Sequence, residues 1–193
     1  EIPLRLVGSE MCIRDSTKTK HLLYPYVYMD VSHVSEIFIN IISNAIKYTN
    51  NGGVINCDIS QAPGKKNGWC DVIITVKDNG IGLSAQQLKK ICNVGVSYSG
   101  DKERKEEIES MPLWLRPTAG FGIGLQSIFL VTKEFEIYSK AAGEDGIYAK
   151  VTSRRKNGYV QVAKSDKLKY QGTEIHIVIP RNFNFSIKVA KNT

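Results

Sequence analysis

The sequence predicts an α/β (α+β) two-layer sandwich, in which a mixed, mostly antiparallel sheet carries helices on one face. Residues 32–49 place apolar side chains at helical spacing, and residues 54–60 and 69–77 alternate as two half-buried strands of a hairpin. Further alternating runs follow late in the chain. Because hairpin-like strands pair antiparallel, helices between them are expected to gather on a single face of the sheet.

Composition sets broad limits on function. The chain has 193 residues, 42% of them hydrophobic and 23% charged, which is ordinary for one globular domain. No apolar run approaches the length needed to span a membrane, so no membrane contact is expected in this segment. The net charge of +7 fits phosphate-rich ligands without pointing to one. We expect a piece of a longer protein in which residues 1–20 are a leader, a scar or a linker, residues 21–182 are the domain, and residues 183–193 are a tail or a linker to a further domain.

The four cysteines argue against a zinc site. Cys12, Cys57, Cys70 and Cys92 show no C-x-x-C spacing and no paired histidines. Reduced thiols are the default for such cysteines, which favours a cytoplasmic or cytosol-facing protein.

The stretch Ser32–Thr49 is the central element of the pattern. At about 100° per residue, one sector of this helix carries Glu36, Asn40, Asn44 and Lys47. The broad opposite side is apolar and comprises Val34, Ile37, Phe38, Ile41, Ile42, Ala45 and Ile46. Amide oxygens suit Mg²⁺, and an ammonium one turn further on suits a phosphate oxygen. Taken alone, the stripe fits a surface helix with incidental asparagines equally well.

The other elements are predicted from caps, glycines and alternation. Leu22–Met29 is expected to form a short strand, Asp30 or Ser32 to cap the central helix, and Asn50–Gly53 to end it. Ser84 is expected to cap a second helix. Helices are also predicted over Ala85–Cys92 and Leu125–Thr132, and strands over Glu134–Ser139, Gly146–Thr152, Tyr159–Val162 and Gly172–Pro180. The long irregular stretch Asn93–Pro117 is expected to be a functional lid or a disordered segment, with a short helix near Lys102–Ile108.

Two glycine motifs lie at element ends. In Asp78-x-Gly80-x-Gly82 a carboxylate can accept from an exocyclic amine such as that of adenine, while the glycines leave room for a ligand ring. The same residues also fit a plain turn, or a dinucleotide fingerprint ending at Ala85, although no second parallel strand follows soon after the helix. Gly120-x-Gly122-x-Gly124 precedes a helix and offers free amides to phosphate oxygens, or forms a hinge-like loop without a ligand.

Together these motifs resemble the GHKL superfamily of gyrase, heat-shock chaperone, histidine kinase and MutL ATPases. Asn40 to Tyr48 is similar to its N-box, the two glycine motifs to its glycine boxes, and Gly172-Thr173 to its closing strand motif, over about residues 24–180. The resemblance implies a Bergerat fold with an ATP lid that binds ATP or ADP and Mg²⁺. The implied nucleotide-binding residues are Asn44, Lys47, Tyr48, Asp78, Gly80, Gly82, Gly120, Phe121, Gly122, Ile123, Gly124, Leu125 and Thr173. The implied metal ligands are Asn44 and Asn40.

The two halves of the chain resemble different branches. The N-box half is similar to sensor histidine kinases, whereas Phe121–Val131 and the strands that follow are similar to ninety-kilodalton heat-shock chaperones. The resemblance puts Asn40 where hydrolytic members carry a water-activating Glu, and Glu36, the other candidate base, lies one turn too early. We therefore expect a histidine-kinase-like phosphoryl donor with a protein phosphoacceptor. The alternatives are a chaperone-like ATPase clamp that dimerises with ATP, and a nucleotide sensor without turnover.

A basic run follows the predicted lid and helix. It comprises Lys150, Arg154, Arg155, Lys156, Lys164, Lys167 and Lys169. Nucleic-acid binding fits this charge, but a solvated hairpin fits better, since the interleaved aromatic residues are limited to Tyr159 and Tyr170.

Overall fold

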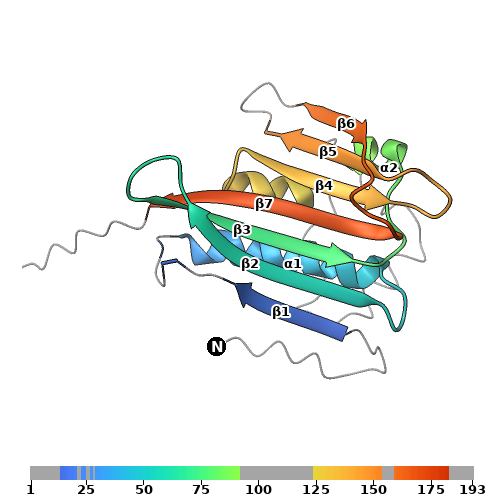
Figure 1. The fold of residues 1–193 in the computed structure, drawn as a ribbon, viewed down its shortest axis with the longest axis horizontal. Helices are drawn as coiled ribbons and strands as arrows, with labels where there is room; N and C mark the ends of the chain where they lie inside the picture. The colour runs from blue at the N-terminus through green and yellow to red at the C-terminus, as the bar shows by residue number, and fades with distance from the viewer. Residues whose placement is uncertain are drawn as a thin grey trace, which may run out of the picture.

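The computed structural model describes residues 14–20, 23–24, 27, 29–91, 124–153 and 159–182. These residues build a single sheet with helices on one side (Figure 1). The elements are β1 (Arg14–Lys20), α1 (Val31–Tyr48), β2 (Val54–Pro63), β3 (Trp69–Asp78), α2 (Ala85–Ile91), the 3-10 helix η1 (Gly124–Leu130), β4 (Glu134–Lys140), β5 (Ile147–Thr152), β6 (Val160–Lys164) and β7 (Gly172–Asn182).

The sheet has seven strands in the order β1-β2-β3-β7-β4-β5-β6. β1 runs parallel to β2, and the other neighbouring pairs are antiparallel, so the predicted mixed, mostly antiparallel sheet is confirmed. The last strand, β7, lies between β3 and β4, which are distant from it in sequence. Its register places Thr173 opposite Asp78 on one side and opposite Ser139 on the other. This central pairing assembles the candidate site described below.

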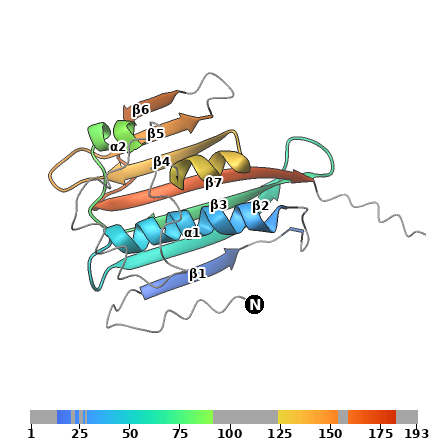
Figure 2. The same ribbon diagram turned by 180° about the vertical axis from the view of Figure 1, so that it is seen from behind.

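The hydrophobic core lies between the helices and the sheet. Figure 2 shows α1 and η1 lying over the same face of the sheet. Ile37 and Ile41 of α1 are each 2% exposed and pack into the core cluster. The strands supply alternate residues to it: Cys70, Val72, Ile74 and Val76 from β3, Phe135 and Ile137 from β4, and Ile177 and Ile179 from β7. A one-residue slip in any of these strands would turn its apolar set away from the helices, so the alternation fixes the register.

Capping defines the helix ends. Of the two candidate caps for α1, the structure selects Asp30, whose Oδ1 accepts from the backbone N–H groups of Ser32 at 3.0 Å and His33 at 3.2 Å. At the other end Gly52 has a φ of 81°, a left-handed conformation that favours glycine. The capping of α2 is reciprocal: Ser84 N–H donates to Gln87 Oε1 at 2.8 Å, and Gln87 N–H donates to Ser84 Oγ at 3.2 Å.

Three expectations differ from the structure. Residues 14–20, assigned to a leader, form edge strand β1, which pairs through its backbone although its sequence is polar. The strand expected over Leu22–Met29 is absent at the described residues of that segment, where Tyr24 instead exchanges two backbone hydrogen bonds with the Gln61 side chain. The helix expected over Leu125–Thr132 is a 3-10 helix over Gly124–Leu130, tightened by a hydrogen bond from Ser127 Oγ to Gly124 O.

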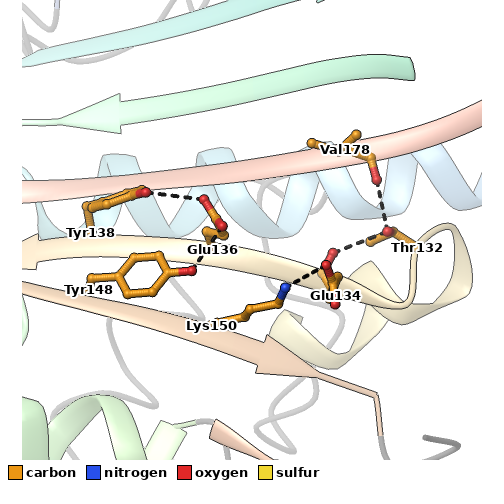
Figure 3. A network of polar contacts seen from close by, with 7 residues as sticks. All are labelled: Thr132, Glu134, Glu136, Tyr138, Tyr148, Lys150 and Val178. Atoms are coloured by element: carbon orange, nitrogen blue, oxygen red, sulfur yellow. Dashed lines mark hydrogen bonds and ion pairs between the residues drawn. The ribbon is translucent and has the colours of Figure 1, made fainter. Parts of the chain in front are cut away.

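On β4 and β5, the face of the sheet opposite the helices carries polar side chains. Figure 3 shows the Glu136 carboxylate between two phenols, accepting from Tyr138 Oη at 3.2 Å and from Tyr148 Oη at 3.0 Å. Burial, together with the hydrogen bond to Glu136, raises the pKa of Tyr148 to about 12. On the same face Lys150 Nζ lies 2.8 Å from Glu134 Oε1. These contacts link β4 to β5 on the face of the sheet that points away from the helices.

Candidate functional site

The Asp78 carboxylate is the centre of the candidate site. It is half-buried at the end of β3, and its Oδ1 accepts from the backbone N–H groups of Gly80 at 2.9 Å and Thr173 at 3.2 Å. Burial raises the pKa of Asp78 above its ordinary value, and the two backbone hydrogen bonds lower it in part. Within the described residues Oδ2 has no hydrogen-bond partner. One oxygen is therefore held in place while the other can accept from a ligand.

The glycines beside Asp78 are required by the packing of the chain itself. A Cβ on Gly80 would collide with the carbonyl oxygen of Tyr48, and a Cβ on Gly82 would collide with that of Lys140. Gly82 also has a φ of 67°, which L side chains rarely adopt. The motif alone predicts that these glycines leave room for a ligand ring. In the structure the described backbone already occupies the space where their side chains would lie.

The C-terminal end of α1 contacts the first glycine motif directly. Ile81 N–H donates to the Tyr48 carbonyl at 3.0 Å. Two residues earlier, Asn79 Oδ1 accepts from Val54 N–H at 2.7 Å, which joins the motif to the start of β2. Tyr48 therefore lies next to the segment that carries Asp78, as the N-box and first glycine motif require if they form one site.

Ser139 completes the arrangement, although the sequence analysis missed it. Its side chain is 0% exposed, and its Oγ lies 3.0 Å from Thr173 Oγ1. Ser139 Oγ also accepts a hydrogen bond from Leu83 N–H at 2.8 Å and donates one to the Gly172 carbonyl oxygen at 3.1 Å. It thereby orients the Thr173 hydroxyl beside Asp78. The available signal was a serine at a core position of an alternating strand, where burial demands a partner.

The polar stripe predicted on α1 is divided by the structure. Glu36 is exposed and Asn44 and Lys47 are half-buried, but Asn40 is only 5% exposed. Its Nδ2 donates to Ser127 Oγ on η1 at 3.1 Å. Asn40 is therefore covered by η1. The sequence could not predict this, because helical periodicity shows which residues share a sector of the helix but not which element packs on that sector. Further along the stripe, the Lys47 ammonium lies 5.7 Å from the centroid of the Tyr48 ring.

Part of the predicted site lies outside the described residues. Gly120, Phe121, Gly122 and Ile123 fall there, as do the lid predicted over Asn93–Pro117 and its short helix. Gly124 and Leu125 are described, as the first two residues of η1. The end of the second glycine motif is therefore placed against α1.

The candidate metal ligands of the site, Asn40 and Asn44, are amides. Among residues 14–20, 23–24, 27, 29–91, 124–153 and 159–182, no group of three or more His, Cys, Asp or Glu side chains gathers as a metal site would require. Asn40 and Asn44 lie one turn apart on α1 and offer amide oxygens, which suit Mg²⁺ bound jointly with phosphate oxygens and water.

The described part of the basic run is largely paired with carboxylates. Lys150 pairs with Glu134, and Lys164 Nζ lies 2.7 Å from Asp145 Oδ2. Lys167 Nζ lies 2.6 Å from Glu174 Oε1 and 3.6 Å from the centroid of the Tyr138 ring. These pairs favour the solvated hairpin over a nucleic-acid surface. Residues 154–156 of the run lie outside the described part of the chain.

Comparison with known families identifies the domain. The family described as histidine kinase-, DNA gyrase B- and HSP90-like ATPases matches residues 29–182, which is most of the chain. The chain belongs to this family. The resemblance drawn from the motifs is thereby confirmed, and the chain is an ATPase-type domain of the GHKL superfamily with a Bergerat-type fold.

Individual relatives of this GHKL domain fall into two groups. The chaperone protein HtpG of Borreliella burgdorferi is 32% identical over 176 residues, covering 84% of this chain and 27% of that protein. The adaptive-response sensory kinase SasA of Prochlorococcus marinus is 33% identical over 101 residues, covering 52% of this chain and 22% of that protein. The sensor protein RprX of Bacteroides fragilis is 26% identical over 122 residues, covering 62% and 20%.

The GHKL domain spans only part of these proteins. It matches about a quarter of the length of HtpG, at 27%, and still less of the sensor kinases. No helix within the described residues is long and apolar enough to cross a membrane.

Proposed function

We propose that this GHKL domain binds Mg²⁺–ATP between α1 and the end of β3, and holds the terminal phosphoryl group for transfer to a protein acceptor, as a histidine-kinase-like domain. The observation that carries the proposal is the state of Asn40. Its side chain is an amide, which cannot take a proton from water, and its nitrogen already donates to Ser127. Asn40 occupies the position at which hydrolytic members of the superfamily resemble one another in carrying a Glu. This position therefore offers no general base in this chain.

Asp78 and Thr173 recognise the adenine. Asp78 Oδ2 accepts from the exocyclic amine, while Oδ1 is held by the Gly80 and Thr173 amides. The Thr173 hydroxyl, oriented by Ser139, adds a second polar group at the same edge. Tyr48 lies against this segment through its backbone carbonyl and supplies an aromatic ring for stacking.

The phosphates lie along α1 toward its middle. Lys47 contributes a point charge to a phosphate oxygen, and Asn44 contributes an amide oxygen to Mg²⁺, with Asn40 as a second candidate ligand. A Mg²⁺ ion held by these amides would supply positive charge to the phosphates during transfer. The glycine-rich residues Gly120–Gly124 are proposed to donate backbone amides to the same phosphates.

Transfer, unlike hydrolysis, needs no base supplied by this domain near the terminal phosphate. Positioning and electrostatic stabilisation supply most of the rate of phosphoryl transfer, and the nucleophile comes from the acceptor. Glu36 is exposed one turn before Asn40, so it does not take over the missing role. The buried free thiols of Cys57 and Cys70 fit a cytoplasmic domain of this kind.

A chaperone-like ATPase clamp is the second candidate. It is favoured by the extent of the match to HtpG, which covers 84% of this chain against 52% for SasA. In that case ATP binding would promote association of two copies of the domain. Sedimentation with and without a non-hydrolysable ATP analogue separates the candidates, because a clamp should dimerise with nucleotide and a phosphoryl donor should stay unchanged.

The nucleotide site itself is tested by calorimetric titration of ATP in Mg²⁺. Asp78→Ala should abolish measurable binding while the circular dichroism spectrum is unchanged. Asp71→Ala is the matched control, because Asp71 lies on the same strand seven residues from Asp78 and on the opposite face of the sheet. Equal ATP affinity in the Asp78 variant and the wild type would refute the proposed site.

A further inference from the structure

Asn40, Ser127 and Gly124 form a buried chain of hydrogen bonds between α1 and η1. Asn40 Nδ2 donates to Ser127 Oγ at 3.1 Å, and Ser127 Oγ donates to the Gly124 carbonyl at 2.7 Å. Asn40 is 5% exposed and Ser127 is 9% exposed. Residues 40 and 127 are far apart in sequence, so folding alone brings them together.

The single proton of the serine hydroxyl fixes the direction of this chain. Since the proton of Ser127 goes to the Gly124 carbonyl, Ser127 Oγ can only accept from Asn40. Asn40 must then turn its NH₂ group to Ser127 and direct its carbonyl oxygen elsewhere. A Cβ built on Gly124 would lie 4.0 Å from Asn40 Oδ1, so this oxygen lies beside the first residue of η1.

We propose that Ser127 is a positioning residue that locks the Asn40 amide with its oxygen, rather than its NH₂ group, presented beside Gly124. This proposal rests on the proposed function and adds to it the orientation of the Asn40 side-chain amide. An amide oxygen accepts from water or binds a cation, whereas an NH₂ group would donate to a phosphate. Ser127 therefore makes Asn40 a selector for the metal-bound form of the nucleotide.

The opposite amide orientation is disfavoured by the same geometry. A flip would point Asn40 Oδ1 at Ser127 Oγ, and Ser127 would have to give it the proton now used for Gly124. The Gly124 carbonyl would lose this bond. A buried hydrogen bond contributes about 0.5–1.5 kcal/mol. This corresponds to a preference of roughly 3- to 10-fold for the observed orientation.

Ser127→Ala tests the lock, and Ser43→Ala is its matched control. Ser43 Oγ also bonds Asn40, but to its backbone carbonyl at 3.2 Å, so removing it spares the side-chain amide. In the nucleotide-free 193-residue chain, heteronuclear NMR reads solvent exchange of the Asn40 side-chain NH₂ protons. Exchange should accelerate roughly 3- to 10-fold in Ser127→Ala and stay unchanged in Ser43→Ala. Unchanged exchange in Ser127→Ala would overturn the lock.

The selector role is read from a ratio of affinities. Titrations of Mg²⁺–ATP and of metal-free ADP should show that Ser127→Ala lowers the ratio of the two association constants roughly 3- to 10-fold, because a freed amide no longer favours the metal-bound form. Ser43→Ala should leave the ratio unchanged. A ratio that is equal in Ser127→Ala and the wild type, or that falls equally in both variants, would overturn the role.

Failure of the lock and failure of the proposed function give different results. If the wild type binds no nucleotide, the proposed function is wrong, and NMR exchange still decides the orientation of the Asn40 amide. If the wild type binds Mg²⁺–ATP and the ratio does not change in Ser127→Ala, the proposed function stands and the selector role of Ser127 is wrong.

Discussion

Replacing Asp78 with Asn isolates the ligand-facing oxygen of the site. The variant keeps Oδ1, which accepts from the Gly80 and Thr173 amides, and replaces Oδ2 with an NH₂ group. The fold around the motif should persist because both backbone hydrogen bonds keep their acceptor. The exocyclic amine of adenine would then meet a donor in place of an acceptor.

The expected loss follows from that single contact. A hydrogen bond to a charged group contributes about 1.5–3 kcal/mol, so Asp78→Asn should weaken ATP and ADP binding by roughly 10- to 150-fold. A nucleotide whose base presents a carbonyl oxygen at the same position, such as inosine triphosphate, should lose much less, or gain. Calorimetric titration of both nucleotides measures the switch. Equal losses for ATP and inosine triphosphate would refute the role of Asp78 in recognising the amine.

The same variant makes a prediction for the stability of the nucleotide-free domain. Burial raises the pKa of Asp78 above its ordinary value of 3.8, so the folded state favours the protonated carboxyl. The stability gained from this is complete below pH 3.8 and is lost as the pH rises through the raised pKa. The Asn side chain of Asp78→Asn does not ionise, so the variant should not lose stability in this way. Urea unfolding at a series of pH values across that window should show the free energy of unfolding of the wild type falling relative to that of the variant. If the two free energies changed in parallel with pH, the Asp78 carboxylate would not be buried as described.

Further substitutions probe the proposed metal ligand, the buried hydroxyl groups and the face of the sheet opposite the helices. Asn44→Ala should weaken Mg²⁺–ATP binding more than metal-free ADP binding, as paired titrations would show. Thr49→Val should raise the free energy of unfolding by about 1 kcal/mol, because the Thr49 hydroxyl is buried without a partner in the described part of the chain. Thr132→Val should lower it, since that hydroxyl bonds the Val178 carbonyl at 2.9 Å (Figure 3). In a spectroscopic pH titration, the phenol that ionises near pH 12 in the wild type should be missing from Tyr148→Phe. Because folding raises the pKa of Tyr148 from 10.0 to about 12, the free energy of unfolding of the wild type should fall between pH 10 and pH 12.

Local patterns predicted most of the fold. The 3.6-residue period, the Asp30 cap and the glycines after the helix placed α1 within about a residue of its observed ends. Alternation placed β3 and β7 comparably well, because both have one buried face. β1 was missed, since its polar sequence joins the sheet as an edge strand through backbone pairing, which leaves no hydrophobic period to read.

The candidate site was predicted as far as its motifs reach. Short motifs point to Asp78 and Thr173 as candidate site residues, and the β3–β7 register places these two residues opposite each other. Ser139 and Ser127 were not found, because their roles depend on contacts with Thr173 and Asn40 that only the folded chain creates. Asn40 itself was assigned to an open polar stripe and proved to be covered by η1.

Phosphate release from ATP by this domain tests the central claim most directly. The account predicts that the wild type binds Mg²⁺–ATP and releases phosphate very slowly, about 10²- to 10⁴-fold below a base-assisted ATPase, because Asn40 supplies no general base. Asp78→Ala serves as the blank for contaminating activity. Brisk release by the wild type that disappears in this blank would show that another group, Glu36 first, activates water. That result would contradict the account of the domain as a phosphoryl donor.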